Sequence, residues 1–355
     1  MEGCMDERSR HGPDAHYHTV ICKLVASRAD LDRAEAARTV DAMLELRFAD
    51  LEIAATLIAL AGKGETADEI AGAVDAIMGH GTPFPAAMTD AIDIGGTGGD
   101  RAGTFNISTT AAFIAAAAGA RVIKHGNRNV TSACGSADLI VALGADIVRC
   151  GTPAHIKASL DADGFAFVST AGHHRFPARL GEIRRALGVP SLFNLAGPLV
   201  HPAAVRRQIV GVAQRSQMAV IAAVLVKLER DAAFVVHGMA GLDEVSCVGE
   251  TQVTHIRHGA TTSFSVTARD FGLMPCRVED LRGGDPATNA AICRAILGGE
   301  RGPRADTAVA AAGMALVLSG RAPTLLDGAR QARHAIDIGA ARRVLENFLH
   351  GARKT

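Results

Sequence analysis

The feature that most constrains the fold is a cluster of glycines placed directly after a short apolar segment. Residues 95–100 read Gly-Gly-Thr-Gly-Gly-Asp and follow the apolar residues 91–94. Glycine permits positive φ angles and lets backbone N–H groups approach an anion closely. A helix that begins near Ser108 would direct the positive end of its dipole toward the same anion. The segment therefore predicts a strand, a turn and a helix that together bind phosphate.

Beyond this turn, short apolar segments alternate with helical patterns, as in a mainly parallel sheet with crossover helices. The strand candidates are residues 91–94, 120–123, 164–168, 208–212 and 232–236. The helix candidates are residues 108–118, 136–143, 153–160 and 217–227. Residues 19–80 carry helical patterns only, including a capping box from Thr66 to Glu69. We predict an α/β protein: a small all-helical N-terminal domain plus a large α/β domain with a central, mainly parallel sheet.

Composition narrows the class of protein. The 355 residues are enough for two domains, and 48% of them are hydrophobic. The 37 basic and 37 acidic residues balance, which argues against a general nucleic-acid binder. Seven cysteines without a CxxC pair favour free thiols in a reducing compartment. Residues 1–18 are polar and read as a disordered leader without a signal peptide, so we expect a cytoplasmic enzyme that does not enter a membrane.

Several further motifs follow the glycine turn in a fixed order. They read GTGGD at 96–100, TFNIST at 104–109, KHGNR at 124–128, GSAD at 135–138, FNLAGPL at 193–199 and GLDEVS at 241–246. This series resembles the anthranilate phosphoribosyltransferase family, within the nucleoside phosphorylase and phosphoribosyltransferase superfamily. The resemblance extends over about residues 20–350.

The resemblance implies an activity and an organisation. The family transfers the phosphoribosyl group of phosphoribosyl pyrophosphate to the amine of anthranilate, releases pyrophosphate and serves tryptophan biosynthesis. It implies two Mg²⁺ ions and a homodimer. The expected domains are a helical domain at residues 19–85, joined by about 177–200, and a phosphoribosyltransferase domain at 90–350.

A site for phosphoribosyl pyrophosphate must neutralise several negative charges and leave C1 open to attack. Backbone amides in the glycine turn, hydroxyl and amide groups at the helix start, and a lysine suit that task. The donor-binding candidates are Gly96, Thr97, Gly98, Gly99, Asp100, Thr104, Asn106, Ser108, Thr109, Lys124, Asn127, Thr131 and Ser136. Helix capping is the alternative role for Thr109 and Ser136.

Metal ligands are expected at Asp243 and Glu244. Mg²⁺ prefers few carboxylates, water and substrate phosphates. Adjacent acids alone would usually be solvated surface, but the surrounding motif favours a metal site. The resemblance assigns this pair to one ion and Ser108 to the other, with Asp100 as a weaker candidate.

The reaction is a displacement at C1 with an oxocarbenium-like transition state, so positioning and charge stabilisation carry much of the rate. We expect Lys124, His125 and Asn127 to act at this centre. His125 either moves a proton or orients the acceptor. Asn127 is placed to hold the acceptor through its amide.

On the acceptor side, the candidates are His174, Arg184 and Gly197. Arg184 aligns with the family arginine and would grip a carboxylate with two parallel hydrogen bonds. The neighbouring segment departs from the family, because Arg175 and Phe176 replace a proline and a small residue. This departure raises the alternative of a paralogue that acts on a different aromatic carboxylate or amine in specialised metabolism.

Two other classes of protein are alternatives to a phosphoribosyltransferase. A pyrimidine nucleoside phosphorylase shares the fold, but KHGNR together with GLDE disfavours it. A nucleic-acid-binding relative without catalysis is disfavoured by zero net charge and by the intact Lys124, Asn127, Asp243 and Glu244.

Overall fold

The computed structural model describes residues 15–82, 84, 88–127 and 133–353. The chain divides into two compact units. A helical unit comprises the chain up to residue 81 together with residues 174–196, and an α/β unit comprises residues 82–173 and 197 onward. The predicted fold class, a helical N-terminal part followed by a large α/β part, is confirmed. The expected domain boundaries, 19–85 with about 177–200 and 90–350, stay a prediction beside these two units.

The helical unit begins with α1 (Ala15–Ile21), so residues 15–18 are helical rather than part of a disordered leader. They are ordered because Tyr17 packs edge-on against Phe48 and Val20 is buried. Residues 1–14 of the expected leader lie outside the described residues. The remaining elements of the unit are η2 (Cys22–Ala26), α2 (Arg33–Leu44), α3 (Asp50–Lys63), α4 (Ala67–Gly79), α10 (Ala178–Leu187) and α11 (Leu192–Ala196).

Helix starts in this unit follow the local sequence. At α4, the Thr66 hydroxyl accepts from the Glu69 amide at 3.3 Å, and the Glu69 carboxylate accepts from the Thr66 amide at 2.8 Å, as the capping box predicted. Glu69 is fully buried, and its second oxygen accepts from the Leu31 amide at 2.9 Å. Lys63 Nζ at 3.0 Å supplies the countercharge. The cap thus also fixes the loop that precedes α2.

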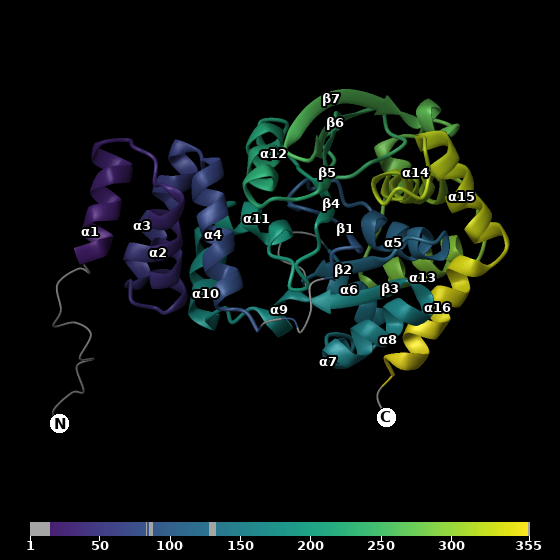
Figure 1. Cartoon of the computed structure of the whole chain (residues 1–355), viewed down its shortest axis with the longest axis horizontal. Helices are drawn as coiled ribbons and strands as arrows, with labels where there is room; N and C mark the ends of the chain where they lie inside the picture. Colours follow the sequence, from purple (N-terminus) through teal and green to yellow (C-terminus); the bar gives the residue numbers. More distant parts are fainter. Residues whose placement is uncertain (1–14, 83, 85–87, 128–132, 354–355) are drawn as a thin grey trace. The chain divides into compact units, whose positions relative to one another are not determined.

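Seven strands form the sheet of the α/β unit, in the order β3-β2-β1-β4-β5-β6-β7 (Figure 1). Strands β1 to β5 pair in parallel, as predicted. The hairpin of β6 and β7 pairs antiparallel and was not predicted. The bounds are β1 (Ile92–Gly96), β2 (Val122–Gly126), β3 (Phe165–Ser169), β4 (Arg207–Gly211), β5 (Ala232–Gly238), β6 (Glu250–Arg257) and β7 (Ala260–Thr267).

Helices cover both faces of the sheet because successive strand residues are buried on opposite sides. Ile92, Ile94 and Val122 belong to a large core with α5 (Ile107–Ala117) and α14 (Pro303–Leu318). Ala91 and Ile123 belong to a second core with residues of β3 and α8 (Pro153–Asp163). Figure 1 shows α5 beside α14 and α15 (Leu325–Asp337).

The other helices of this unit are α6 (Ser136–Ala142), α7 (Ile147–Cys150), α8 (Pro153–Asp163), α9 (Thr170–His173), η3 (Gly197–Leu199), α12 (Gln217–Lys227), η4 (Ala268–Phe271), η5 (Val278–Leu281), α13 (Pro286–Leu297), α15 (Leu325–Asp337) and α16 (Ala340–Gly351). Across the described ranges, no helix combines the length and the apolar character that a membrane crossing needs.

Candidate active site

The strand order places a candidate site at the carboxyl ends of β1 and β4. The chain runs from β1 to β2 and β3 on one side, and β4 and β5 lie on the other, so the order reverses between β1 and β4. Open α/β sheets bind ligands in the crevice at such a reversal. The glycine turn follows β1 at this point, and α5 begins at Ile107, one residue before the predicted Ser108.

Within the glycine turn, Gly98 and Gly99 adopt positive φ angles of 68° and 85°. These conformations favour glycine, as expected for a turn that exposes backbone amides. The Thr97 amide instead donates to the Gly211 carbonyl at 2.9 Å and ties the turn to β4. Gly96, Gly98 and Gly99 are exposed, so this part of the turn is accessible to a ligand.

Two glycines allow the Asp243 segment to approach the strand ends. A Cβ atom at Gly96 would lie 2.5 Å from Asp243 Oδ2, and one at Gly211 would lie 1.6 Å from the Asp243 carbonyl oxygen. The segment packs directly on β1 and β4 as a result. Asp243 Oδ2 accepts from the Gly98 amide at 2.7 Å, and Glu244 Oε1 accepts from the Ser108 amide at 3.3 Å. The structure thus brings the predicted metal ligands to the glycine turn and the start of α5.

The two carboxyl groups are held in an environment that disfavours their charge. Burial, together with the charge of Asp100, raises the pKa of Asp243 to about 7. Burial and the adjacent Asp243 raise the pKa of Glu244 to about 8. Clustered carboxyl groups with raised pKa values fit a divalent cation, which would supply the missing positive charge. Asp243, Glu244 and the Ser108 hydroxyl form an oxygen donor set of the kind that Mg²⁺ prefers.

Strand alternation separates Lys124 from His125. Lys124 lies on the face of Val122, with its Nζ donating to the Ile94 carbonyl at 2.6 Å. It is 2% exposed, and burial lowers its pKa, opposed by the charges of Asp93, Glu244 and Asp243. His125 lies on the opposite face, with Asp93. The two residues, predicted to act together, therefore belong to different environments on β2.

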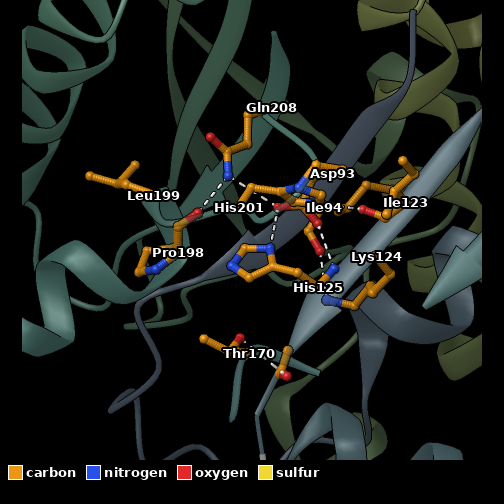
Figure 2. A network of polar contacts seen from close by, with 12 residues as sticks. Asp93, Ile94, Ile123, Lys124, His125, Thr170, Pro198, Leu199, His201 and Gln208 are labelled. Atoms are coloured by element: carbon orange, nitrogen blue, oxygen red, sulfur yellow. Dashed lines mark hydrogen bonds and ion pairs between the residues drawn. The ribbon is translucent and has the colours of Figure 1, made fainter. Parts of the chain in front are cut away.

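On its own face, His125 belongs to a buried polar network, which Figure 2 shows. Its Nδ1 lies 2.8 Å from Asp93 Oδ2, and its Nε2 lies 3.2 Å from the Gly197 carbonyl oxygen. Burial raises the pKa of Asp93, but the attraction of His125 outweighs this, and the net pKa lies far below its usual range. The Gln208 amide donates to Asp93 Oδ2 at 3.1 Å and also to the Pro198 carbonyl (Figure 2).

Asp93, His125 and His201 place one possible metal-ligand atom each within 4.8 Å of one another. His201 Nδ1, however, accepts from the Ala203 amide at 3.1 Å, and its Nε2 lies 2.9 Å from the Ile123 carbonyl. A metal ligand needs a free lone pair, and hydrogen bonds already occupy both nitrogens of the His125 and His201 rings. We assign this trio to the hydrogen-bonded network rather than to a metal.

The remaining donor-side predictions fall at the starts of α5 and α6. Thr109 Oγ1 donates to Ser136 Oγ at 3.3 Å, and Ser136 lies at the first position of α6. Asn106 binds within the protein, because its amide donates to the Cys134 carbonyl at 3.0 Å and its oxygen accepts from Asn289 at 2.9 Å. Through these hydrogen bonds, Asn106 connects the start of α5 to the segment before α6 and to α13.

Two other residues predicted to bind the donor lie near these helices in the sequence. Thr104 pairs its backbone with Arg282 in an isolated bridge, and Asn127 is exposed at the end of β2. Thr131 lies outside the described residues.

The predicted acceptor residues Arg184 and His174 lie in the helical unit. The Arg184 guanidinium stacks over the Phe193 ring at 5.1 Å from its centroid, and burial lowers its pKa. No carboxylate within 4.0 Å pairs with Arg184 among the described residues. Phe176, the departure from the family pattern, packs edge-on against the same Phe193 ring at 5.7 Å. His174 is buried and pairs with Gly81 in an isolated bridge.

Sequence reasoning missed four buried polar residues: Asp93, His201, Gln208 and Asn289. Asp93 and Gln208 carry a detectable signal, because each places a polar side chain inside an otherwise apolar strand. Asn289 lies in α13, and no local pattern distinguishes it from a surface residue.

Known proteins match the chain over most of its length. Residues 18–81 match the helical bundle domain and residues 88–342 the a/b domain of the glycosyl transferase family. The anthranilate phosphoribosyltransferase of Methylobacterium radiotolerans is 42% identical, over 92% of this chain and 94% of that protein. That of Parvibaculum lavamentivorans is 41% identical, over 94% of this chain and 96% of the relative.

Solved structures agree in fold. The anthranilate phosphoribosyltransferase of Thermus thermophilus superposes with a TM-score of 0.86 at 34% identity, over 94% of this chain and 99% of that one. The Saccharomyces cerevisiae enzyme, in complex with PRPP and Mg, gives 0.87 at 28% identity, over 96% and 98% of the two chains. The chain therefore belongs to the anthranilate phosphoribosyltransferase family.

Proposed function

We propose that the protein transfers the phosphoribosyl group of phosphoribosyl pyrophosphate to the amine of anthranilate, with release of pyrophosphate, as a pentosyltransferase of tryptophan biosynthesis. The observation that carries the proposal is the convergence of the glycine turn, the start of α5 and the Asp243–Glu244 pair at the end of β1. The family, and the complex of the yeast enzyme with PRPP and Mg, support the donor.

The donor site is built from backbone groups. The turn is exposed at Gly98 and Gly99, with the Gly98 amide donating to Asp243, and Ser108 and Thr109 occupy the first turn of α5. Both features attract phosphate. Thr109 and Ser136 share a hydrogen bond that brings two hydroxyl groups to one place. Lys124 donates to the Ile94 carbonyl in β1 and supplies positive charge near Asp243 and Glu244.

Asp243, Glu244 and Ser108 would hold Mg²⁺. The bound cation would neutralise the pyrophosphate and favour its departure as a Lewis acid. The protein's own part is to keep the oxygen donors in place through the Gly98 and Ser108 amides. The number of ions is part of the proposal: the resemblance implies two.

Arg184 binds the carboxylate of the acceptor. Its guanidinium is partly desolvated on Phe193 and pairs with no acidic group of the described chain within salt-bridge distance, so a carboxylate ligand would find an unneutralised cation. The structure of the yeast enzyme in complex with 4-fluoroanthranilate supports an aromatic acid as acceptor. The contact of Phe176 with Phe193 adds bulk beside Arg184 and would tune which aromatic acid is preferred.

The test is a screen for pyrophosphate release from phosphoribosyl pyrophosphate and Mg²⁺ with anthranilate, ring-substituted anthranilates and benzoates. We expect turnover with anthranilate and loss of turnover when Mg²⁺ is chelated. Turnover with a different aromatic acid, but not with anthranilate, would contradict the assignment and favour the specialised paralogue.

We also propose a homodimer that forms through the helical unit. The family resemblance supports it, and α3 exposes two large apolar side chains, Leu51 at 83% and Ile58 at 45% exposed. Light scattering at micromolar concentration should give twice the mass of the chain. A monomer would contradict the proposal.

A further inference from the structure

Three consecutive carbonyl groups in η3 are each held by a buried or half-buried side chain from a different part of the sheet. His125 Nε2 lies 3.2 Å from the Gly197 oxygen, and the Gln208 amide donates to the Pro198 oxygen. The Arg230 guanidinium donates to the Leu199 oxygen at 3.1 Å. The three side chains come from β2, β4 and the residues before β5.

These holding groups are themselves joined. Asp93 Oδ2 faces His125 Nδ1 at 2.8 Å and accepts from the Gln208 amide at 3.1 Å (Figure 2). Arg230 Nε donates to Gln208 Oε1 at 3.4 Å. Asp93 and Gln208 are fully buried, so water does not replace a lost partner readily. One carboxylate thus sets the position of both side chains that hold Gly197 and Pro198.

A turn of three residues does not need this arrangement for stability alone. Burying a carboxylate is costly, and hydrophobic residues of similar volume are often as stable. The network instead fixes the η3 backbone and the His125 ring with respect to each other. Gly197 and His125 are both residues proposed to contact the acceptor, and neither Asp93 nor Gln208 touches the donor groups described above.

We infer that Asp93 and Gln208 are positioning residues for the acceptor, acting through the His125 ring and the Gly197 and Pro198 carbonyls. The inference rests on the proposed function. It predicts that weakening the network loosens η3 and impairs use of the acceptor, while the donor site is unaffected.

The test uses Gln208→Met, which keeps the volume and removes the amide. Gln331→Met is the matched control, because Gln331, half-buried on α15, also donates one amide hydrogen bond to a backbone carbonyl, but that bond is exposed to solvent. Arg230→Met, at the half-buried edge of the network, serves if Gln208→Met fails to fold. Each variant is assayed by hydrogen–deuterium exchange of peptides covering residues 195–205 and by steady-state kinetics.

We expect faster exchange in residues 195–205 and a rise of roughly 10-fold in the acceptor KM, because the variant loses the hydrogen bonds of Gln208 to Asp93, to the Pro198 carbonyl and from Arg230. The donor KM should change by less than about twofold, since Gln208 makes no contact with the donor groups. Unchanged exchange would overturn the inference, as would faster exchange with both KM values unchanged or raised equally. A wild-type protein that does not turn over anthranilate would refute the proposed function, whereas the exchange result would still decide whether the network holds η3.

Discussion

The His201 imidazole should make the protein sensitive to mild acid. It is 1% exposed, its Nδ1 accepts from the Ala203 amide, and its Nε2 donates to the Ile123 carbonyl. This pair of bonds requires the neutral ring, because a protonated Nδ1 would meet another donor. Burial lowers the pKa of His201 to about 3, against an ordinary value of 6.5.

The direction in which pH changes the stability follows from proton binding. Between pH 6.5 and about 3, the unfolded chain protonates this imidazole and the folded protein does not. The neutral His201 ring therefore makes its full contribution to the folding stability above pH 6.5. The stability falls as the pH falls through this window. Each pH unit corresponds to about 1.4 kcal/mol, so lowering the pH to about 4.5 should remove about 3 kcal/mol.

The assay is urea unfolding, followed by circular dichroism at about pH 7.5 and about pH 4.5, for wild type, His201→Gln and His350→Gln. Glutamine cannot titrate, so His201→Gln should be less stable at the higher pH but lose about 3 kcal/mol less on acidification. His350 is exposed, and its variant should follow the wild type. A parallel loss of stability in wild type and His201→Gln would refute the reasoning.

Three further changes test the site. Gly211→Ala would place a Cβ atom 1.6 Å from the Asp243 carbonyl, so calorimetry should show loss of Mg²⁺-dependent donor binding; unchanged binding would mean that the segment moves away freely. Asp243→Asn combined with Glu244→Gln should weaken Mg²⁺ activation and cut turnover by roughly 10²-fold, and an unchanged Mg²⁺ titration would identify the pair as structural. Arg184→Ala should raise the acceptor KM by roughly 10- to 150-fold, since a charge-assisted hydrogen bond contributes about 1.5–3 kcal/mol. Arg184→Lys should not restore the acceptor KM of the wild type. An equal rise in the donor KM would contradict the proposal that Arg184 binds the acceptor carboxylate.

The parallel strands were predictable because they are buried on both faces and read as apolar runs. The hairpin of β6 and β7 was not, because β7 is largely exposed at the sheet edge and its sequence, ATTSFSVT, contains no apolar run. The edge of a sheet has only one neighbouring strand to pair with, and its exposed side chains leave little hydrophobic pattern.

In the site, the turn at Gly98 and Gly99 was predictable from local chemistry. The close approach of Asp243 to Gly96 joins residues far apart in the sequence, and no local pattern encodes it. The hydrogen bond between Gln208 and Asp93 likewise spans 115 positions. The separation of Lys124 from His125 could have been predicted from the sequence, because adjacent strand residues point to opposite faces of the sheet.

The path of the chain sets a condition on chimeric proteins. The helical unit is made of two separate stretches, up to residue 81 and residues 174–196, and α10 and α11 of the second pack on α3 and α4 of the first. A chimera that exchanges only the N-terminal stretch with a relative would set foreign helices against the resident α10 and α11, which carry Arg184 and Phe193. With Arg184 in its proposed role, we expect that exchanging acceptor preference between family members requires both stretches to be transplanted together, with the α/β unit left as the recipient.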